Sequence, residues 1–290
     1  MKNIIVSAIV AACVAWATFF FVGKSTTPVE TQTSSDKFLD RVEKSGELRC
    51  GYVNNPPFVI LDPNTHEVSG IMVDLTAKIG ELTGWKVTWP SETTYPTMTE
   101  DLARGKFDVF CGGGWPIATS EKRQWWSGPL FYSAVGAFAR VDDERFGPNF
   151  STKDLDNPAY KISFIDGVAV DRVRSMDFPR STPVSLPNIS NYGEMILQVV
   201  GGKADVVLIE LETAYRYMAK NPGKIKRIDG NKPVRFYGIG YEFSFDAPRL
   251  RNVFEAASQE LVYGGVVDRI LTKYEEQPGM FYRVRPIGSP

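Results

Sequence analysis

Segments with apolar residues at helical spacing alternate with short apolar runs along most of the chain. The spacing predicts helices at 37–46, 71–84, 97–105, 168–176, 191–202 and 211–223, and two within 247–274. The runs predict strands at 47–53, 85–90, 107–112, 161–166, 182–187, 204–210 and 234–243. A hairpin-like extended stretch is expected at 56–70. This alternation in two successive series predicts an α/β protein with two lobes, mostly parallel sheets and helices on both sheet faces.

Two of the predicted strands end in residues that stand out chemically. In open α/β sheets, ligands bind beyond the carboxyl ends of the strands. The strand at 107–111 runs into Gly112, Gly113 and Gly114, and the strand at 204–209 runs into Glu210. A ligand site is therefore expected where these two strand ends come together.

Composition and charge exclude several classes of function. Hydrophobic residues make up 43% of the 290 residues, enough for globular domains with hydrophobic cores. The formal net charge is -1, so the chain lacks the excess of basic residues that nucleic-acid-binding domains usually have. The single histidine, His66, sits in a turn-rich segment at 62–70. One histidine argues against a histidine-based metal site or a Ser/His triad, and no cofactor is expected.

The N-terminal 24 residues form a separate, strongly apolar segment. An uncharged stretch at 4–23 lies between Lys2 and Lys24 and is long enough to span a bilayer. We interpret residues 1–24 as an uncleaved anchor; a cleaved signal peptide and a lipid anchor at Cys13 are the alternatives. Residues 25–35 are polar and predict a flexible tether. Each alternative places the rest of the chain outside the cytoplasm.

Cys50 and Cys111 each close an apolar run. We interpret them as two buried thiols that act as small apolar side chains. A disulfide between them is the alternative, which an oxidising compartment would permit if their strands are neighbours.

Six short motifs follow one another in an order that is typical of one protein family. They are PPF at 56–58, GIMVDLTAKIGELTG at 70–84, LARGKFDVF at 102–110, TSEKRQWWSGPLFYS at 119–133, GGKADVVLIE at 201–210 and GGVVDRILTKY at 264–274. In this order, over about 38–274, the chain resembles the extracellular solute-binding proteins of family 3, the amino-acid-type receptors of ABC importers.

The resemblance implies a fold. The family has a two-lobed, type II periplasmic-binding-protein-like fold, here preceded by the N-terminal apolar helix. Lobe 1 would comprise 36–140 and 236–290, and lobe 2 would comprise 141–235. Two crossing strands, at 136–140 and 235–241, would form a hinge about which the lobes close on a ligand.

The resemblance also implies two charged anchors for the ligand. Arg123 falls on the arginine that holds the α-carboxylate, and a guanidinium suits a carboxylate because it forms two parallel hydrogen bonds. It is expected at the start of a helix, where free N–H groups also favour an anion. Glu210 falls on the acid that binds the α-ammonium. A helix cap is the alternative role for Glu210, and Glu212 is expected to be a pure cap.

Aromatic residues are expected to form the walls of this site. Tyr95 falls where the family often places a stacking ring, and Trp115 follows the glycines at the strand end. Tyr52, near the end of the strand at 47–53, is also taken as a lining residue. Ordinary core packing is the alternative for Tyr95 and Trp115. Trp125 and Trp126 are expected to pack rather than to bind.

At four positions the chain departs from the family pattern. Ala118 stands where a hydroxyl usually reaches the carboxylate, Asn55 replaces a common aromatic residue, and Val168 and Ala169 replace a threonine pair. Backbone N–H groups can still bind an anion at 118 and 168. These changes remove polar contacts but keep the charge pair, so a larger or more apolar zwitterion or a plain carboxylate is also possible.

The predicted function is capture of a small amino-acid-like solute for an ABC permease, outside the cytoplasm and tethered through 4–23. No catalytic residue is expected. Two alternatives stay open. The first is a dehydratase-like enzyme on the same fold, with Glu210 as the general acid. The second is a ligand-sensing input for a membrane partner.

Overall fold

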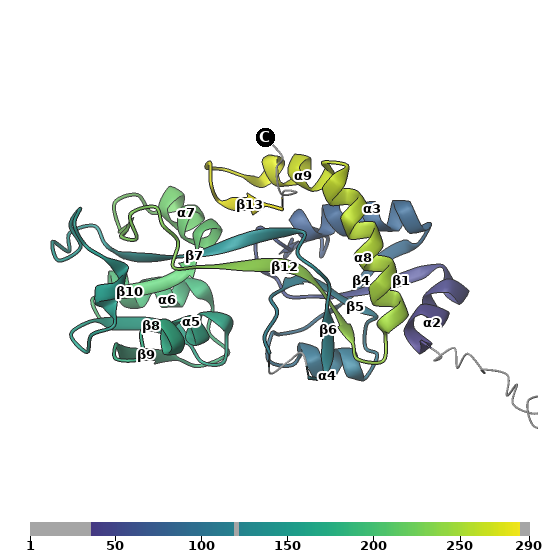
Figure 1. Ribbon diagram of the computed structural model, residues 1–290, viewed down its shortest axis with the longest axis horizontal. Helices are drawn as coiled ribbons and strands as arrows, with labels where there is room; N and C mark the ends of the chain where they lie inside the picture. The colour runs from purple at the N-terminus through teal and green to yellow at the C-terminus, as the bar shows by residue number, and fades with distance from the viewer. Residues whose placement is uncertain (1–35, 119–121, 285–290) are drawn as a thin grey trace, which may run out of the picture. The chain divides into compact units, whose positions relative to one another are not determined.

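The two successive α/β series build two lobes that share strands of one mixed sheet (Figure 1). The computed structural model describes residues 36–118 and 122–284, so the predicted apolar span at 4–23 and the tether at 25–35 lie outside the described residues. Within the described ranges, no helix has both the length and the apolar character needed to cross a membrane.

Lobe 1 is built from the first α/β series and the C-terminal helices. Its elements are α2 (Lys37–Ser45), β1 (Glu47–Tyr52), β2 (Ile60–Leu61), β3 (Val68–Ser69), α3 (Ile71–Thr83), β4 (Lys86–Glu92), α4 (Met98–Ala103), β5 (Val109–Gly114), β6 (Gln124–Trp126), α8 (Pro248–Tyr263) and α9 (Val266–Tyr274). The predicted helices at 37–46, 71–84 and 97–105 are confirmed by α2, α3 and α4. Each helix ends close to the residue where its apolar periodicity stops.

Lobe 2 is built from the second series. Its elements are the 3₁₀ helix η1 (Thr152–Leu155), β8 (Lys161–Ile165), α5 (Ala169–Asp177), β9 (Thr182–Leu186), α6 (Tyr192–Val200), β10 (Val206–Glu210), α7 (Leu211–Lys220) and β11 (Ile225–Arg227). Every strand and helix predicted between 161 and 223 is present within a few residues of its expected bounds.

Two long antiparallel strands, β7 (Phe131–Arg140) and β12 (Arg235–Ser244), run from one lobe to the other (Figure 1). The main strand order is β4-β1-β5-β12-β7-β10-β8-β9. Pairing is parallel at both ends of this order and antiparallel from β5 to β10. The short β6, β11 and β13 (Phe281–Arg283) add to these central strands and were not predicted.

Each lobe has its own hydrophobic core, and the crossing strands contribute to both. On β7, Phe131 packs in the lobe 1 core and Ala134 packs in the lobe 2 core. On β12, Ile239 belongs to the lobe 1 core, whereas Tyr237 packs against the lobe 2 core. Trp115 and Tyr215 also pack against both cores, and the lobe boundaries at 140 and 235 stay a prediction.

A buried carboxylate fixes β5 against β1 and α2. Asp108 is fully buried and accepts hydrogen bonds from the backbone N–H and guanidinium of Arg49 and from the guanidinium of Arg41. Removing both arginines would leave a buried charge uncompensated, which typically costs several kcal/mol. This network holds the strand that carries the glycine loop to the site.

The interpretation of the two cysteines as free thiols is wrong. Cys50 on β1 and Cys111 on β5 form a disulfide, with a Cα–Cα distance of 5.4 Å. The two strands are parallel neighbours, and Cys50 lies opposite Val109 in the register. The sequence alone does not show which strands are adjacent, so it could not bring the two sulfurs together.

Candidate functional site

A cavity of about 240 Å³ lies between the lobes, at the carboxyl ends of β5 and β10. Lobe 1 contributes Asn55, Phe58, Tyr95, Pro96, Met98, Thr99, Gly113, Trp115, Ile117, Arg123, Gln124 and Glu242. Lobe 2 contributes Gly167, Val168, Ala169, Tyr192 and Glu210. The volume lies below the range of drug-sized pockets and suits a small solute.

The glycines at the end of β5 leave space for this cavity and for the Glu242 side chain that lines it. Gly113 has φ +84°, a conformation that favours glycine. A Cβ at Gly114 would overlap the carboxylate of Glu242. Glycine at 114 is therefore a steric requirement for the buried acid on the neighbouring β12.

Glu242 is part of a buried polar chain on the lobe 1 side. Its side chain lines the cavity although the residue is only 2% exposed. The Thr99 hydroxyl donates to Gln124 Oε1 at 2.7 Å, and Gln124 Nε2 donates to the Glu242 carboxylate. Since a hydroxyl donor holds the amide oxygen, the amide NH₂ is directed at Glu242.

Glu210 is the acid on the lobe 2 side. It ends β10, is 4% exposed, lines the cavity, and its Oε2 has no hydrogen-bond partner among the described residues. Burial raises the pKa of Glu210 from 4.5 to about 7. No side chain caps α7, so the alternative role as a helix cap is not what Glu210 does here.

Glu212, two residues after Glu210, is not part of the cavity wall. It is buried, and its Oε1 accepts a hydrogen bond of 2.7 Å from the Ser133 hydroxyl of β7. Burial, and then the charge of Glu210, raise the pKa of Glu212 to about 8. The expected pure helix cap is wrong, since the side chain points into the sheet and bonds to β7.

Arg123 reaches the cavity from lobe 1, but not from a helix. Lys122 and Arg123 form a turn that leads directly into β6. The predicted helix start is wrong at this position, because Gln124 to Trp126 pair with β12 instead. Arg123 is exposed and has no ion pair with any other described residue. Its guanidinium is available to a ligand without help from a helix dipole.

The N-terminus of α5 faces the same cavity from lobe 2. Gly167, Val168 and Ala169 line the cavity, and no side chain caps the helix at Val168. The first N–H groups of a helix favour an anion. Uncapped backbone N–H groups at the start of α5 therefore lie at the cavity wall.

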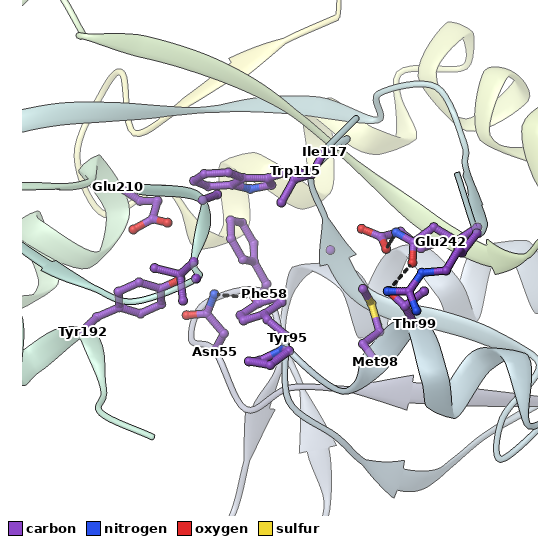
Figure 2. Close-up of a pocket in the computed structure, with 17 residues that line it drawn as sticks. Asn55, Phe58, Tyr95, Met98, Thr99, Trp115, Ile117, Tyr192, Glu210 and Glu242 are labelled. Carbon is purple, nitrogen blue, oxygen red and sulfur yellow. Dashed lines mark hydrogen bonds between the residues drawn. The ribbon is translucent and has the colours of Figure 1, made fainter. Parts of the chain in front are cut away.

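Aromatic side chains line the central part of the cavity (Figure 2). Trp115 stacks on Tyr237 of β12 with 4.0 Å between ring centroids. Asn55 Nδ2 donates to the Tyr95 hydroxyl at 3.1 Å, and Tyr95 packs edge-on against Phe110. Tyr95 thus combines the two roles that the sequence left open, a wall of the cavity and a contact to the core.

Six of the eight predicted site residues lie on the cavity and two do not. Tyr52 is buried in the lobe 1 core, where its ring packs edge-on against Trp89. Ala118 is exposed and is not part of the cavity wall. Trp125 stacks on Phe245 and Trp126 donates its indole N–H to the Gly114 carbonyl, so the expected packing role of both tryptophans is confirmed.

Four of the polar residues that line the cavity were not predicted from the sequence. The missed polar residues are Thr99, Gln124, Tyr192 and Glu242. Gln124 is next to Arg123 in the sequence, so its position was a usable signal. Glu242 carries no such signal, because it lies within an apolar strand far along the chain.

The sequence matches a known protein family, and the fold is similar to those of several solved structures. Residues 48–277 match the family model of bacterial extracellular solute-binding proteins, family 3. No curated protein sequence matches the chain. Similar solved structures include the ancestral amino-acid-binding protein AncCDT-1, a precursor of cyclohexadienyl dehydratase, with 23% identity over 81% of this chain and 98% of that chain and a TM-score of 0.69.

Two further structures have the same fold. One is a putative ABC-transporter binding component from Wolinella succinogenes complexed with lysine, with 21% identity over 80% of this chain and 97% of that chain and a TM-score of 0.70. The other is a mutant ArgBP from T. maritima, with 22% identity over 83% of this chain and 100% of that chain and a TM-score of 0.67. At these identities the likeness is one of fold.

Proposed function

Because the chain belongs to the bacterial extracellular solute-binding proteins of family 3, we propose that it captures a small amino acid between its lobes for ABC-type import. The observation that carries this proposal is Glu210, a buried acid with an unpaired oxygen in the cavity wall. Burying an ionised carboxylate lowers the stability of the folded protein unless a cation pairs with it or a proton neutralises it. An α-ammonium group would compensate it.

The opposite charge comes from the other lobe. Arg123 of lobe 1 would hold the α-carboxylate, and the uncapped N-terminus of α5 in lobe 2 would add backbone N–H donors. A zwitterion would therefore contact both lobes, its α-carboxylate through Arg123 and the start of α5 and its α-ammonium through Glu210. Closure about β7 and β12 would then strengthen these contacts, because it removes water from them.

The first test is a thermal-shift and calorimetry screen of the protein against the twenty amino acids, small carboxylates and amines. At one hundred times its dissociation constant, a ligand should stabilise the protein by about 2.7 kcal/mol. The proposal requires binding of at least one α-amino acid. If none of them shifts the melting temperature or gives a heat of binding, the proposal is wrong.

Arg123→Ala is expected to weaken binding of the amino acid about ten- to hundredfold, because a charged hydrogen-bonding partner of the carboxylate is lost. Lys122→Ala is the matched control, since Lys122 is an adjacent exposed cation that does not line the cavity. Calorimetry on both variants measures the difference. Equal affinities for the two variants would show that Arg123 has no role in binding.

Binding is also expected to depend on pH below neutrality. Glu210 must be ionised to hold an ammonium group, and its pKa in the ligand-free protein is raised by burial to about 7. The affinity should fall about tenfold for each pH unit below 7. Calorimetry between pH 5.5 and 8 measures this slope, and the slope should disappear in Glu210→Gln. A flat profile in the unmodified protein would contradict the role of Glu210.

Delivery to a permease and a location outside the cytoplasm are part of the proposal. The family consists of extracellular proteins, and a similar structure is described as a binding component of an ABC transporter. The disulfide fits an oxidising compartment. Membrane tethering through 4–23 stays a prediction. Loss of labelled amino-acid uptake on gene deletion, and recovery of the protein in membranes, would test these two points.

A dehydratase-like activity is a second candidate, since a buried acid with a pKa of about 7 suits general acid catalysis. One similar structure is described as a precursor of cyclohexadienyl dehydratase. The test is turnover of a prephenate-like cyclic carboxylate, followed by absorbance. Turnover that is lost in Glu210→Gln would support the enzyme. Binding of an amino acid without any turnover would favour the solute-binding protein.

A further inference from the structure

We propose that Tyr237, a residue of β12 that does not line the cavity, positions the ring of Trp115 for contact with the ligand. This inference deepens the proposed function and rests on it, because it assumes that an amino acid binds in the cavity. Tyr237 is then a positioning residue, which acts on the ligand through Trp115 and not by direct contact.

The segment that carries Trp115 has no regular secondary structure to hold the ring in place. β5 ends at Gly114, and residues 115–118 belong to neither a helix nor a strand. Unlike the indoles of Trp125 and Trp126, the indole of Trp115 donates no hydrogen bond to another described residue. The orientation of this ring in the cavity wall therefore depends on the side chains that pack against it.

Tyr237 provides a close, face-to-face contact for this ring. The two rings are nearly parallel, with 4.0 Å between their centroids and 11° between their planes. Within the described ranges, no other ring pair has so short a centroid distance. Stacked aromatic rings stabilise each other beyond the apolar area that they bury. The indole meets the cavity with the surface that Tyr237 leaves free, and Figure 2 shows it between Glu210 and Ile117.

Tyr237, in contrast to Trp115, lies on a strand that is paired with its neighbour. It is opposite Ser133 of β7 in the antiparallel register, and its side chain packs against the lobe 2 core. Two residues earlier, Arg235 forms an ion pair with Asp177 at the end of α5. The stack therefore fastens a ring on an irregular segment to a paired strand. A binding surface that is already in place loses less conformational entropy when the ligand arrives.

The test is a double-mutant cycle on the full chain. The probe is the proteinogenic amino acid that binds most tightly in the thermal-shift screen, titrated by calorimetry. Tyr237→Ala is expected to weaken its binding about three- to tenfold, because the Trp115 ring loses the surface that orients it. In a Trp115→Ala background, the same change should alter the affinity less than about twofold. A loss of equal size in both backgrounds would overturn the inference, and the proposed function would stand.

Two single variants control for a purely structural effect on β12. Tyr237→Phe keeps the stacked ring and should bind the probe within about twofold of the unmodified protein. Phe236→Ala removes the adjacent ring of β12, which is 48% exposed, contacts Tyr282 and does not line the cavity. This variant should bind like the unmodified protein. A loss in Phe236→Ala as large as that in Tyr237→Ala would overturn the inference.

A second comparison applies if Tyr237→Ala or the double variant does not fold. Tyr237→Leu is then compared with Tyr237→Phe, since leucine keeps apolar volume but offers no flat face for stacking. Binding of the probe that is about threefold weaker or more in Tyr237→Leu supports the inference, and equal affinities would overturn it. Absence of binding by any amino acid to the unmodified protein would overturn both the inference and the proposed function.

Discussion

Glu210→Gln is expected to stabilise the ligand-free protein at pH 8 by about 3 kcal/mol and to leave its stability at pH 4 nearly unchanged. The reason is that burial raises the pKa of Glu210 from 4.5 to about 7. The folded protein therefore holds a proton that the unfolded chain releases above about pH 4.5. Its free energy of unfolding falls as the pH rises from about 4.5 to about 7, and glutamine removes this loss.

Urea unfolding of the two proteins at pH 4 and pH 8 measures this difference, provided that the m-value stays constant. Glu212 adds to the same trend up to about pH 8, since burial and the charge of Glu210 raise its pKa. Glu260→Gln serves as the exposed control and should shift neither midpoint. A Glu210→Gln protein that is less stable than the unmodified protein at pH 8 would contradict this account.

This expected gain in stability has a functional consequence. The same substitution removes the acid that we propose for the α-ammonium group, so the more stable variant should bind its ligand less tightly. Binding sites often carry such unfavourable groups, because the ligand supplies the compensating interaction. Measurement of stability and affinity on one variant therefore separates a binding acid from a merely structural one.

Removal of the disulfide is expected to destabilise the protein by about 4 kcal/mol, because the Cys50–Cys111 bridge closes a loop with a sequence separation of 61 residues. Cys50→Ala/Cys111→Ala is the suitable change, since both side chains are fully buried. The expected result is a lower urea midpoint with the two-lobed fold retained.

The control for this prediction is the unmodified protein unfolded in the presence of a reductant, which should lose a similar amount of stability. The affinity for the ligand at a temperature where both proteins are folded should change little, because neither cysteine lines the cavity. Equal urea midpoints for the double variant and the oxidised protein would show that the bridge does not contribute to stability.

The sequence by itself determined the local elements and their order. The apolar periodicity at 71–84 and 191–202 and the apolar runs at 161–166 and 204–210 predicted α3, α6, β8 and β10. Helical and extended periods are local properties, so neighbouring residues are sufficient to show them. Glu210 was placed at a strand end on the same basis, and it lies on the cavity.

Only the tertiary structure decided which distant residues meet. Cys50 and Cys111 form a disulfide because β1 and β5 are neighbours, and the segment after Arg123 is a strand because β12 offers it an edge. Glu242 lies beside Gln124, 118 residues earlier in the chain. Such contacts depend on strand order and register, which local periodicity does not encode. Arg123 and Glu210, which both line the cavity, could therefore be predicted from the sequence, whereas the polar residues around Glu242 became visible only in the folded chain.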